Sequence, residues 1–98
     1  MTKLDMREIL DVLRERGYEP QDAPYADLFD LIASGAGSVR VVAYRGSKPS
    51  LRVVALDKFG MHRWNLRLGP DIPLPVFLAV LGAAEAELSA LAGRKITA

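Results

Sequence analysis

Residues 38–68 read SVRVVAYRGSKPSLRVVALDKFGMHRWNLRL and decide the fold class. β-Branched and aromatic residues, which favour strands, dominate three runs within this stretch. The runs are Val39–Tyr44, Leu51–Leu56 and Met61–Leu68. They are separated by the short turn-type segments 46–49 and 57–60, so the sequence predicts a three-stranded antiparallel meander.

The second turn predicts how the strands align. Asp57 at its first position and Gly60 at its fourth are typical of a type I turn with a glycine bulge, which pairs Asp57 with Met61. If the first hairpin closes around Gly46–Pro49, the three strands agree on one core face. This predicted face comprises Val39, Val41, Ala43, Val54, Leu56, His62, Trp64 and Leu66.

The opposite face of the predicted sheet has an apolar centre and a rim of arginines. An apolar centre edged by arginine is typical of protein interfaces. A cationic sheet with an aromatic side chain such as Tyr44 also suits a nucleic acid. Ala55 is expected on this face as well. The predicted partner-binding residues are Arg40, Val42, Tyr44, Leu51, Val53, Arg63, Asn65 and Arg67.

A helix is predicted at the start of the chain, at Leu4–Arg16. Its apolar residues recur at helical spacing between polar ones. Asp5 and Glu8 are spaced like a capping box, which favours a helix start, and Gly17 is typical of a helix end.

A short second helix with Pro24 in its first turn is predicted, because Tyr25, Leu28, Phe29 and Ile32 share one helical face. The Gly35-Ala36-Gly37 segment is expected to end this helix. Phosphate-binding glycine loops lead into a helix, whereas this one leads into a strand, so we expect a turn and not a phosphate site.

The last helix, predicted at Pro75–Leu91, carries no charge until Glu85, so it must be buried on more than one side. Small residues recur at successive turns and let another helix approach closely, either the first helix or a copy in a second subunit. The sequence therefore predicts a homodimer, and Gly93 is expected to end the helix. The predicted dimer residues are Ala79, Ala83, Ala86 and Ala90.

These elements predict one small α+β domain of two layers over the 98 residues: an N-terminal helix with a short second helix, a three-stranded antiparallel meander and a C-terminal helix. The order resembles that of double-stranded RNA-binding domains and of HicA-type toxin nucleases. Residues Ile9–Tyr18 resemble the first helix of many small α+β proteins, including secretion-chaperone-like folds. These resemblances imply the two-layer fold, and no functional residue carries over from them.

Charge is divided by segment. Between Val39 and Leu68, seven cations accompany one anion, Asp57, for a formal charge of +6, while the rest of the chain carries −5. The basic segment attracts phosphate, but the acidic flanks repel a polyanion that wraps the whole domain. We therefore expect a protein partner, with a nucleic acid bound by the basic sheet of residues 39–68 as the alternative.

Catalytic and metal chemistry has few candidates. The chain has no Cys and a single His, His62, which we expect to pack beside Trp64. Asp27 and Asp30 share the predicted second helix, but hard cations require more oxygen ligands than these two supply. The sequence predicts a non-enzymatic protein without a metal or cofactor.

No targeting segment is predicted. The N-terminus lacks the apolar region of a signal peptide, and the uncharged run Ile72–Ala84 is too short to span a bilayer. The absence of Cys is compatible with a reducing cytosol. We expect a cytoplasmic protein with no membrane contact.

Overall fold

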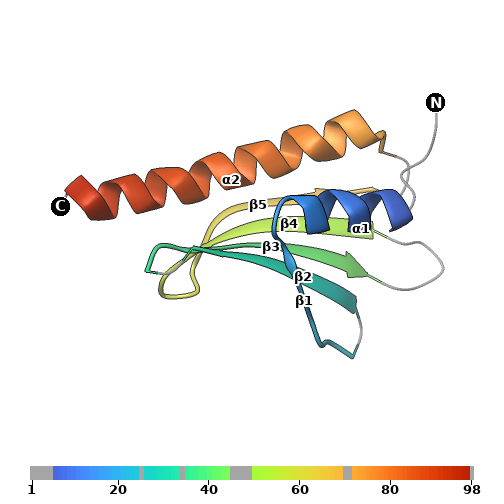
Figure 1. The fold of residues 1–98 in the computed structure, drawn as a ribbon, viewed down its shortest axis with the longest axis horizontal. Helices are drawn as coiled ribbons and strands as arrows, with labels where there is room; N and C mark the ends of the chain where they lie inside the picture. Colours follow the sequence, from blue (N-terminus) through green and yellow to red (C-terminus); the bar gives the residue numbers. More distant parts are fainter. Residues whose placement is uncertain (1–5, 25, 34, 45–49, 70–71, 98) are drawn as a thin grey trace.

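The computed structural model describes residues 6–24, 26–33, 35–44, 50–69 and 72–97. One helix precedes five strands, and a second helix follows them (Figure 1). The elements are α1 (Met6–Glu15), β1 (Glu19–Gln21), β2 (Ala26–Ala33), β3 (Gly37–Tyr44), β4 (Ser50–Asp57), β5 (His62–Leu68) and α2 (Leu74–Thr97). The strands form one antiparallel sheet in the order β1-β2-β3-β4-β5. The fold is α+β as predicted, but its meander has five strands where three were predicted.

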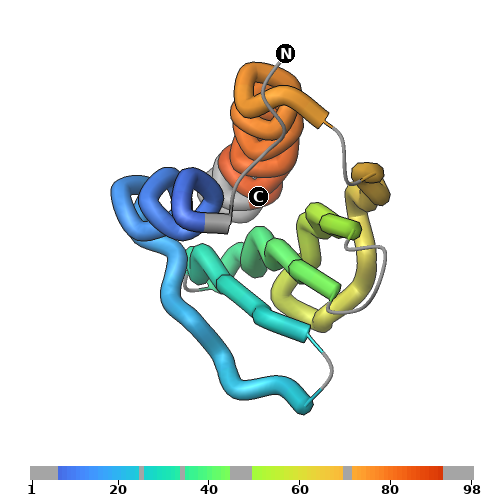
Figure 2. The backbone as a smooth tube through the Cα atoms, turned by 90° about the vertical axis from the view of Figure 1, so that its right-hand side faces the viewer, coloured from blue at the N-terminus to red at the C-terminus, as the bar shows by residue number. Residues whose placement is uncertain are grey.

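Both helices cover the same face of the sheet, and the other face carries neither of them (Figure 2). Leu13 of α1, Val41 of β3 and Phe77 of α2 are fully buried where the layers meet. Alternate strand residues point to opposite faces, so Val39 and Ala43 lie beside Val41 on the helix-covered side, as predicted. The core therefore occupies one side of the sheet only.

The predicted second helix is wrong, because residues 26–33 form strand β2. Phe29 and Leu31 point toward the helices, while Asp30 points the other way. Phe29 pairs with Pro20 of β1 on one side and Val41 of β3 on the other. The segment ADLFDLIA satisfies both the helical and the strand period, and tertiary pairing decides between them.

The predicted alignment of β3 with β4 is also wrong. Tyr44 lies opposite Ser50, and Val41 lies opposite Val53. The connection is one residue longer than the predicted closure at Gly46–Pro49, and residues 45–49 themselves lie outside the described part of the chain. A shift of one residue turns every side chain of a strand to the other face. Leu51, Val53 and Ala55 therefore lie in the core, where Val54 and Leu56 were predicted.

The predicted turn between β4 and β5 is confirmed. The amide of Asp57 donates a 2.9 Å hydrogen bond to the carbonyl of Met61, and Gly60 adopts a φ of 80°. A bulge follows, since Leu56 pairs with His62 but Ala55 pairs with Trp64. Beyond the bulge Trp64 and Leu66 face the helix layer, as predicted. His62 is exposed on the other side, so its predicted packing in the core is wrong.

Gly37 is where the turn after β2 comes closest to the neighbouring backbone. Its φ is 141°, and a Cβ added there would lie 1.9 Å from the carbonyl oxygen of Leu56. Only glycine fits this position without moving the backbone of β4. The Gly35-Ala36-Gly37 segment is thus a turn between two strands, and its predicted role as a helix end is wrong.

The sequence predicted the C-terminal end of α1 correctly but not that of α2. α1 ends at Glu15 and is terminated as predicted by Gly17, whose φ is 87° and whose amide donates a hydrogen bond to the carbonyl of Arg14. Asp5 of the predicted capping box lies outside the described residues. α2 continues to Thr97, so Gly93 does not end it.

Candidate interaction surfaces

The uncovered side of the sheet, which we call the outer face, is built from alternate residues of four strands. It excludes two predicted partner-binding residues, Leu51 and Val53, because both are buried in the core. Arg52, which lies between them on β4, points to the outer face in their place. The sequence analysis missed Arg52 because it assigned β4 the wrong alignment. The outer face comprises Leu28, Asp30, Ile32, Ser38, Arg40, Val42, Tyr44, Arg52, Val54, Leu56, His62, Asn65 and Arg67.

The apolar centre of the outer face is shielded by its own neighbours. Val42 is 9% exposed and Val54 is 4% exposed, although no helix lies over them. Arg52 lies directly opposite Val42, and Arg40 lies directly opposite Val54. Long arginine stems cover apolar surface while their heads stay in water. A partner approaching the outer face therefore meets guanidinium groups before it meets valine.

Arg40 is committed to a partner within the chain. Its Nε and Nη2 donate hydrogen bonds of 2.8 and 3.0 Å to the two carboxylate oxygens of Asp30. Asp30 is buried, and this fork of bonds raises the pKa of Arg40 above its usual value. The pair joins β2 to β3 and neutralises both charges.

Arg52 and Arg67 have a different environment. They lie directly opposite one another on β4 and β5, an arrangement that like charges disfavour. Arg52 donates a 2.9 Å hydrogen bond to Asn65, and the Arg67 guanidinium lies 5.9 Å from the ring centre of Tyr44. Neither forms a salt bridge within the described residues. Their positive charge is available to an anionic group.

Arg63 does not lie with Arg52 and Arg67 on the outer face. Its Nε donates a 2.9 Å hydrogen bond to Asp57 in the β4–β5 turn. The same carboxylate accepts hydrogen bonds from the amides of Met61 and Phe59, and these bonds together with Arg63 lower the pKa of Asp57. Arg63 therefore supports the turn, and its predicted place on the partner-binding face is not seen.

A second surface is the side of α2 that faces away from the sheet. Its inner side packs Phe77, Leu81 and Ala84 in the core. The outer side is exposed and is not covered by α1, and Glu87 borders it one turn after Ala83. Small residues dominate it, and all four predicted dimer residues are present. We call it the α2 outer side; it comprises Pro75, Ala79, Gly82, Ala83, Ala86 and Ala90.

The apolar character of α2 exceeds what the sheet covers. Within the described residues, the stretch Leu74–Leu91 is long and apolar enough, by length and composition alone, to cross a membrane, yet 28% of it is buried. The core helix of a soluble protein can be equally long and apolar, but such a helix is mostly buried. Most of this apolar stretch lacks a covering element.

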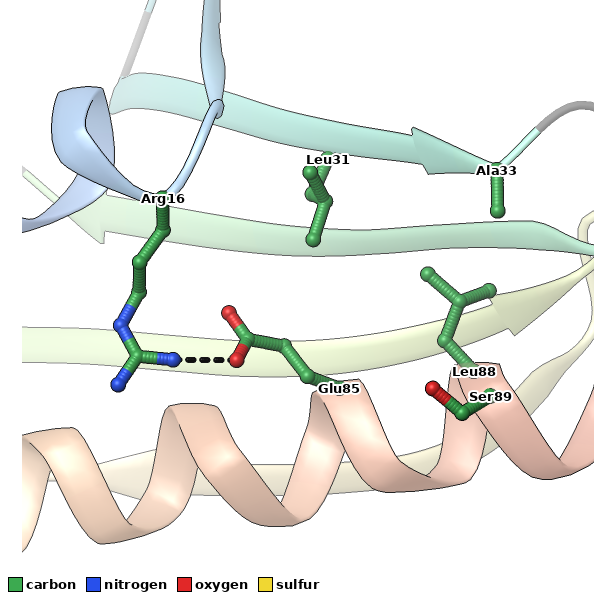
Figure 3. A pocket seen from close by; sticks show the side chains of 6 residues that line it. All are labelled: Arg16, Leu31, Ala33, Glu85, Leu88 and Ser89. Carbon is green, nitrogen blue, oxygen red and sulfur yellow. Dashed lines mark hydrogen bonds and ion pairs between the residues drawn. The ribbon is translucent and has the colours of Figure 1, made fainter.

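A pocket of about 320 Å³ lies between α2 and the neighbouring elements (Figure 3). Arg16 and Glu85 form an ion pair across it. Glu85 also accepts a 2.9 Å hydrogen bond from the hydroxyl of Tyr18, and burial together with this bond raises the pKa of that phenol. This ion pair and this hydrogen bond form a brace between the α1 end and α2.

The described residues contain no group of three or more His, Asp or Glu side chains that could hold a metal ion. Asp27 and Asp30, considered together in the sequence, point to opposite faces of β2. No protein family, curated protein or solved structure matches this chain. Function must therefore be inferred from the two surfaces themselves.

Proposed function

We propose that this chain is a non-enzymatic interaction protein that forms a homodimer through the α2 outer side and binds another protein through its sheet. The observation that supports the dimer is the exposed side of α2, which is built from small uncharged residues. A contiguous exposed apolar patch on a soluble protein marks an interaction site. No other described element of the chain lies over it.

A second copy of α2 suits this side for geometric reasons. Ala79, Ala83 and Ala86 are exposed and recur at one-turn spacing. Small side chains let two helix axes approach to about 8 Å, and a two-fold axis lets the same stripe serve both subunits. Glu85 lies away from this stripe, since it faces α1 and its carboxylate is paired there, while Glu87 lies at the border of the stripe.

Light scattering across a range of protein concentrations tests the dimer. We expect a dimer for the native chain and a monomer for Ala83→Glu, which places a charge in the stripe. Gln21→Glu adds the same charge at an exposed position of β1 and should leave the dimer intact. A native chain that stays monomeric at tens of micromolar, or a Gln21→Glu variant that dissociates equally, contradicts the proposal.

Nucleic acid binding is the second candidate, supported by the Arg52 and Arg67 guanidiniums beside Tyr44. If it holds, affinity for an oligonucleotide falls steeply with salt, and the Arg52→Ala/Arg67→Ala double variant lowers the slope of log affinity against log salt by up to about two units. Arg14→Ala, an exposed position on α1, is the matched control. The absence of binding at low salt excludes this candidate.

A further inference from the structure

The two edges of the sheet are unlike. The β1 edge is three residues long, Glu19–Gln21, and contains Pro20. A short strand, a proline and a charge are the devices that protect an edge from pairing. The β5 edge is seven residues long, His62–Leu68, and contains no proline. Among the described elements, β5 pairs with β4 alone, so its second side is open.

Apolar side chains border the open edge on the helix side. Leu66 faces the helix layer from β5 and is 40% exposed. Val76 of α2 is 45% exposed, and it lies about two and a half turns before Glu85, hence on the opposite side of the helix. Because Glu85 faces α1, Val76 faces the β5 side. An added strand would cover both.

Positive charge borders the same edge on the outer face. Arg67 belongs to β5 itself, and Arg52 lies directly opposite it on β4. Neither forms a salt bridge in the described part of the chain. Carboxylates on an added strand would therefore relieve an existing repulsion between two cations.

We propose that the β5 edge binds an extended segment of another protein as a sixth strand, in which apolar and acidic residues alternate. Successive side chains of a strand point to opposite faces, so one set covers Leu66 and Val76 while the other meets Arg67 and Arg52. Backbone hydrogen bonds supply affinity, and the alternation supplies specificity. The inference rests on the proposed protein-binding function and specifies its partner.

A second copy of β5 fits this edge less well. If two β5 strands pair antiparallel about Asn65, Arg63 of one lies opposite Arg67 of the other. If they pair about Leu66, the two Arg67 side chains become diagonal neighbours near both copies of Arg52. Like charges so placed are destabilising. An acidic partner strand avoids both arrangements.

Synthetic peptides of about seven residues test the inference, with Trp64, the single tryptophan, as a reporter within β5. One peptide alternates Val with Glu, a second has the same composition in two blocks, and a third alternates Val with Lys. We expect the Val/Glu peptide alone to shift Trp64 fluorescence and to slow amide hydrogen exchange at His62–Leu68. Equal binding of the block peptide, or no slowing in β5, overturns the proposal.

Variants locate the site. Leu66→Lys and Arg67→Glu should each weaken binding of the Val/Glu peptide by about tenfold or more, and Arg67→Glu should bind the Val/Lys peptide in its place. Ile32→Lys, an equally apolar exposed position on β2, is the matched control and should bind normally. If Ile32→Lys weakens binding as much as Leu66→Lys, the edge is not the site.

Two further results distinguish a partner strand from a second copy of this chain at the β5 edge, and the β5 proposal from the proposed function. Protection of β5 that rises with protein concentration in the absence of peptide shows a second copy at the edge and overturns the partner assignment. If the peptides do not bind while Ala83→Glu still converts a dimer to a monomer, the β5 proposal fails alone. A chain that neither dimerises nor binds any peptide contradicts the proposed function as well.

Discussion

The hydroxyl of Tyr18 donates a 2.9 Å hydrogen bond to Oε2 of Glu85, which joins the end of α1 to the middle of α2. Tyr18 is 5% exposed, and Arg16 pairs with the other carboxylate oxygen. The two helices lie on the same face of the sheet, and this brace fixes how they sit beside each other.

Tyr18→Phe is expected to lower the free energy of unfolding by about 1–2 kcal/mol, because it removes a hydrogen bond to a charged group. Denaturant titration measures the loss. In a double-mutant cycle with Glu85→Ala the two losses should not add, since both changes remove the same bond. Additive losses would show that the bond contributes nothing.

The same phenol predicts a loss of stability in alkali. Its pKa in the folded chain lies above the ordinary value of 10.0, chiefly because of burial. Below pH 10 the phenol is neutral in both states; above it the unfolded chain releases a proton that the folded chain retains. The free energy of unfolding should therefore fall as pH rises above 10, by at most about 1.4 kcal/mol per unit for this one group. Tyr18→Phe should show a shallower fall, and an unchanged slope contradicts the assignment.

Arg40→Ala is expected to lower the free energy of unfolding by about 1.5–3 kcal/mol, because Asp30 is then buried without its partner. Replacing both residues, as Asp30→Leu/Arg40→Leu, should cost less than the single change. Thermal and denaturant unfolding compare the variants. If Arg40→Ala leaves stability unchanged, the pair is only a surface contact and Arg40 is free to bind a ligand.

Asp57 predicts a loss of stability in acid. Hydrogen bonds from the Met61 and Phe59 amides and the Arg63 guanidinium hold the pKa of Asp57 below its ordinary value of 3.8. Its contribution is therefore present above pH 3.8 and is lost as the pH falls through the lower folded-state pKa. Asp57→Asn should be less stable at neutral pH and should lose less on acidification. Parallel pH profiles for the two proteins would contradict this role.

Gly37→Ala is expected to destabilise the fold by about 3 kcal/mol or more, because a Cβ there collides with the Leu56 carbonyl. Gly69→Ala is the matched control, since an added Cβ at Gly69 meets no atom within 4 Å. Circular dichroism on heating compares them. Equal melting temperatures for the two variants would mean that the backbone of β4 yields at no cost.

The sequence predicted elements whose signals are local and missed those that depend on pairing. The Asp57–Gly60 turn and the end of α1 at Gly17 carry their own chemistry and were predicted correctly. Residues 26–33 carry two competing periods, and only their contact with β3 decides for a strand. β1 was missed because a short strand containing Pro20 has no strand signal of its own.

The candidate site shows the same division. The strand signal in β3 correctly placed Arg40, Val42 and Tyr44 on the outer face. For β4, the turn gave the right pair, Leu56 with His62, but a bulge one residue later and a longer first connection moved the rest of the strand. Both errors shift the strand by one, so they agreed with each other and produced a consistent but wrong face. The glycine bulge of the turn has a sequence signal, but the bulge between Ala55 and Leu56 and the length of the first connection have none strong enough to detect.

The difference between the two edges also limits how many strands can be added to the sheet. Head-to-tail growth of a sheet from copies of one chain consumes a different edge of each copy at every step. Here Pro20 and the brevity of β1 close one of the two edges, so such growth cannot begin. A strand of another protein that pairs with β5 presents its own second edge, so any further growth depends on that partner and not on this chain. The chain is therefore built to accept one strand and not to propagate a fibre.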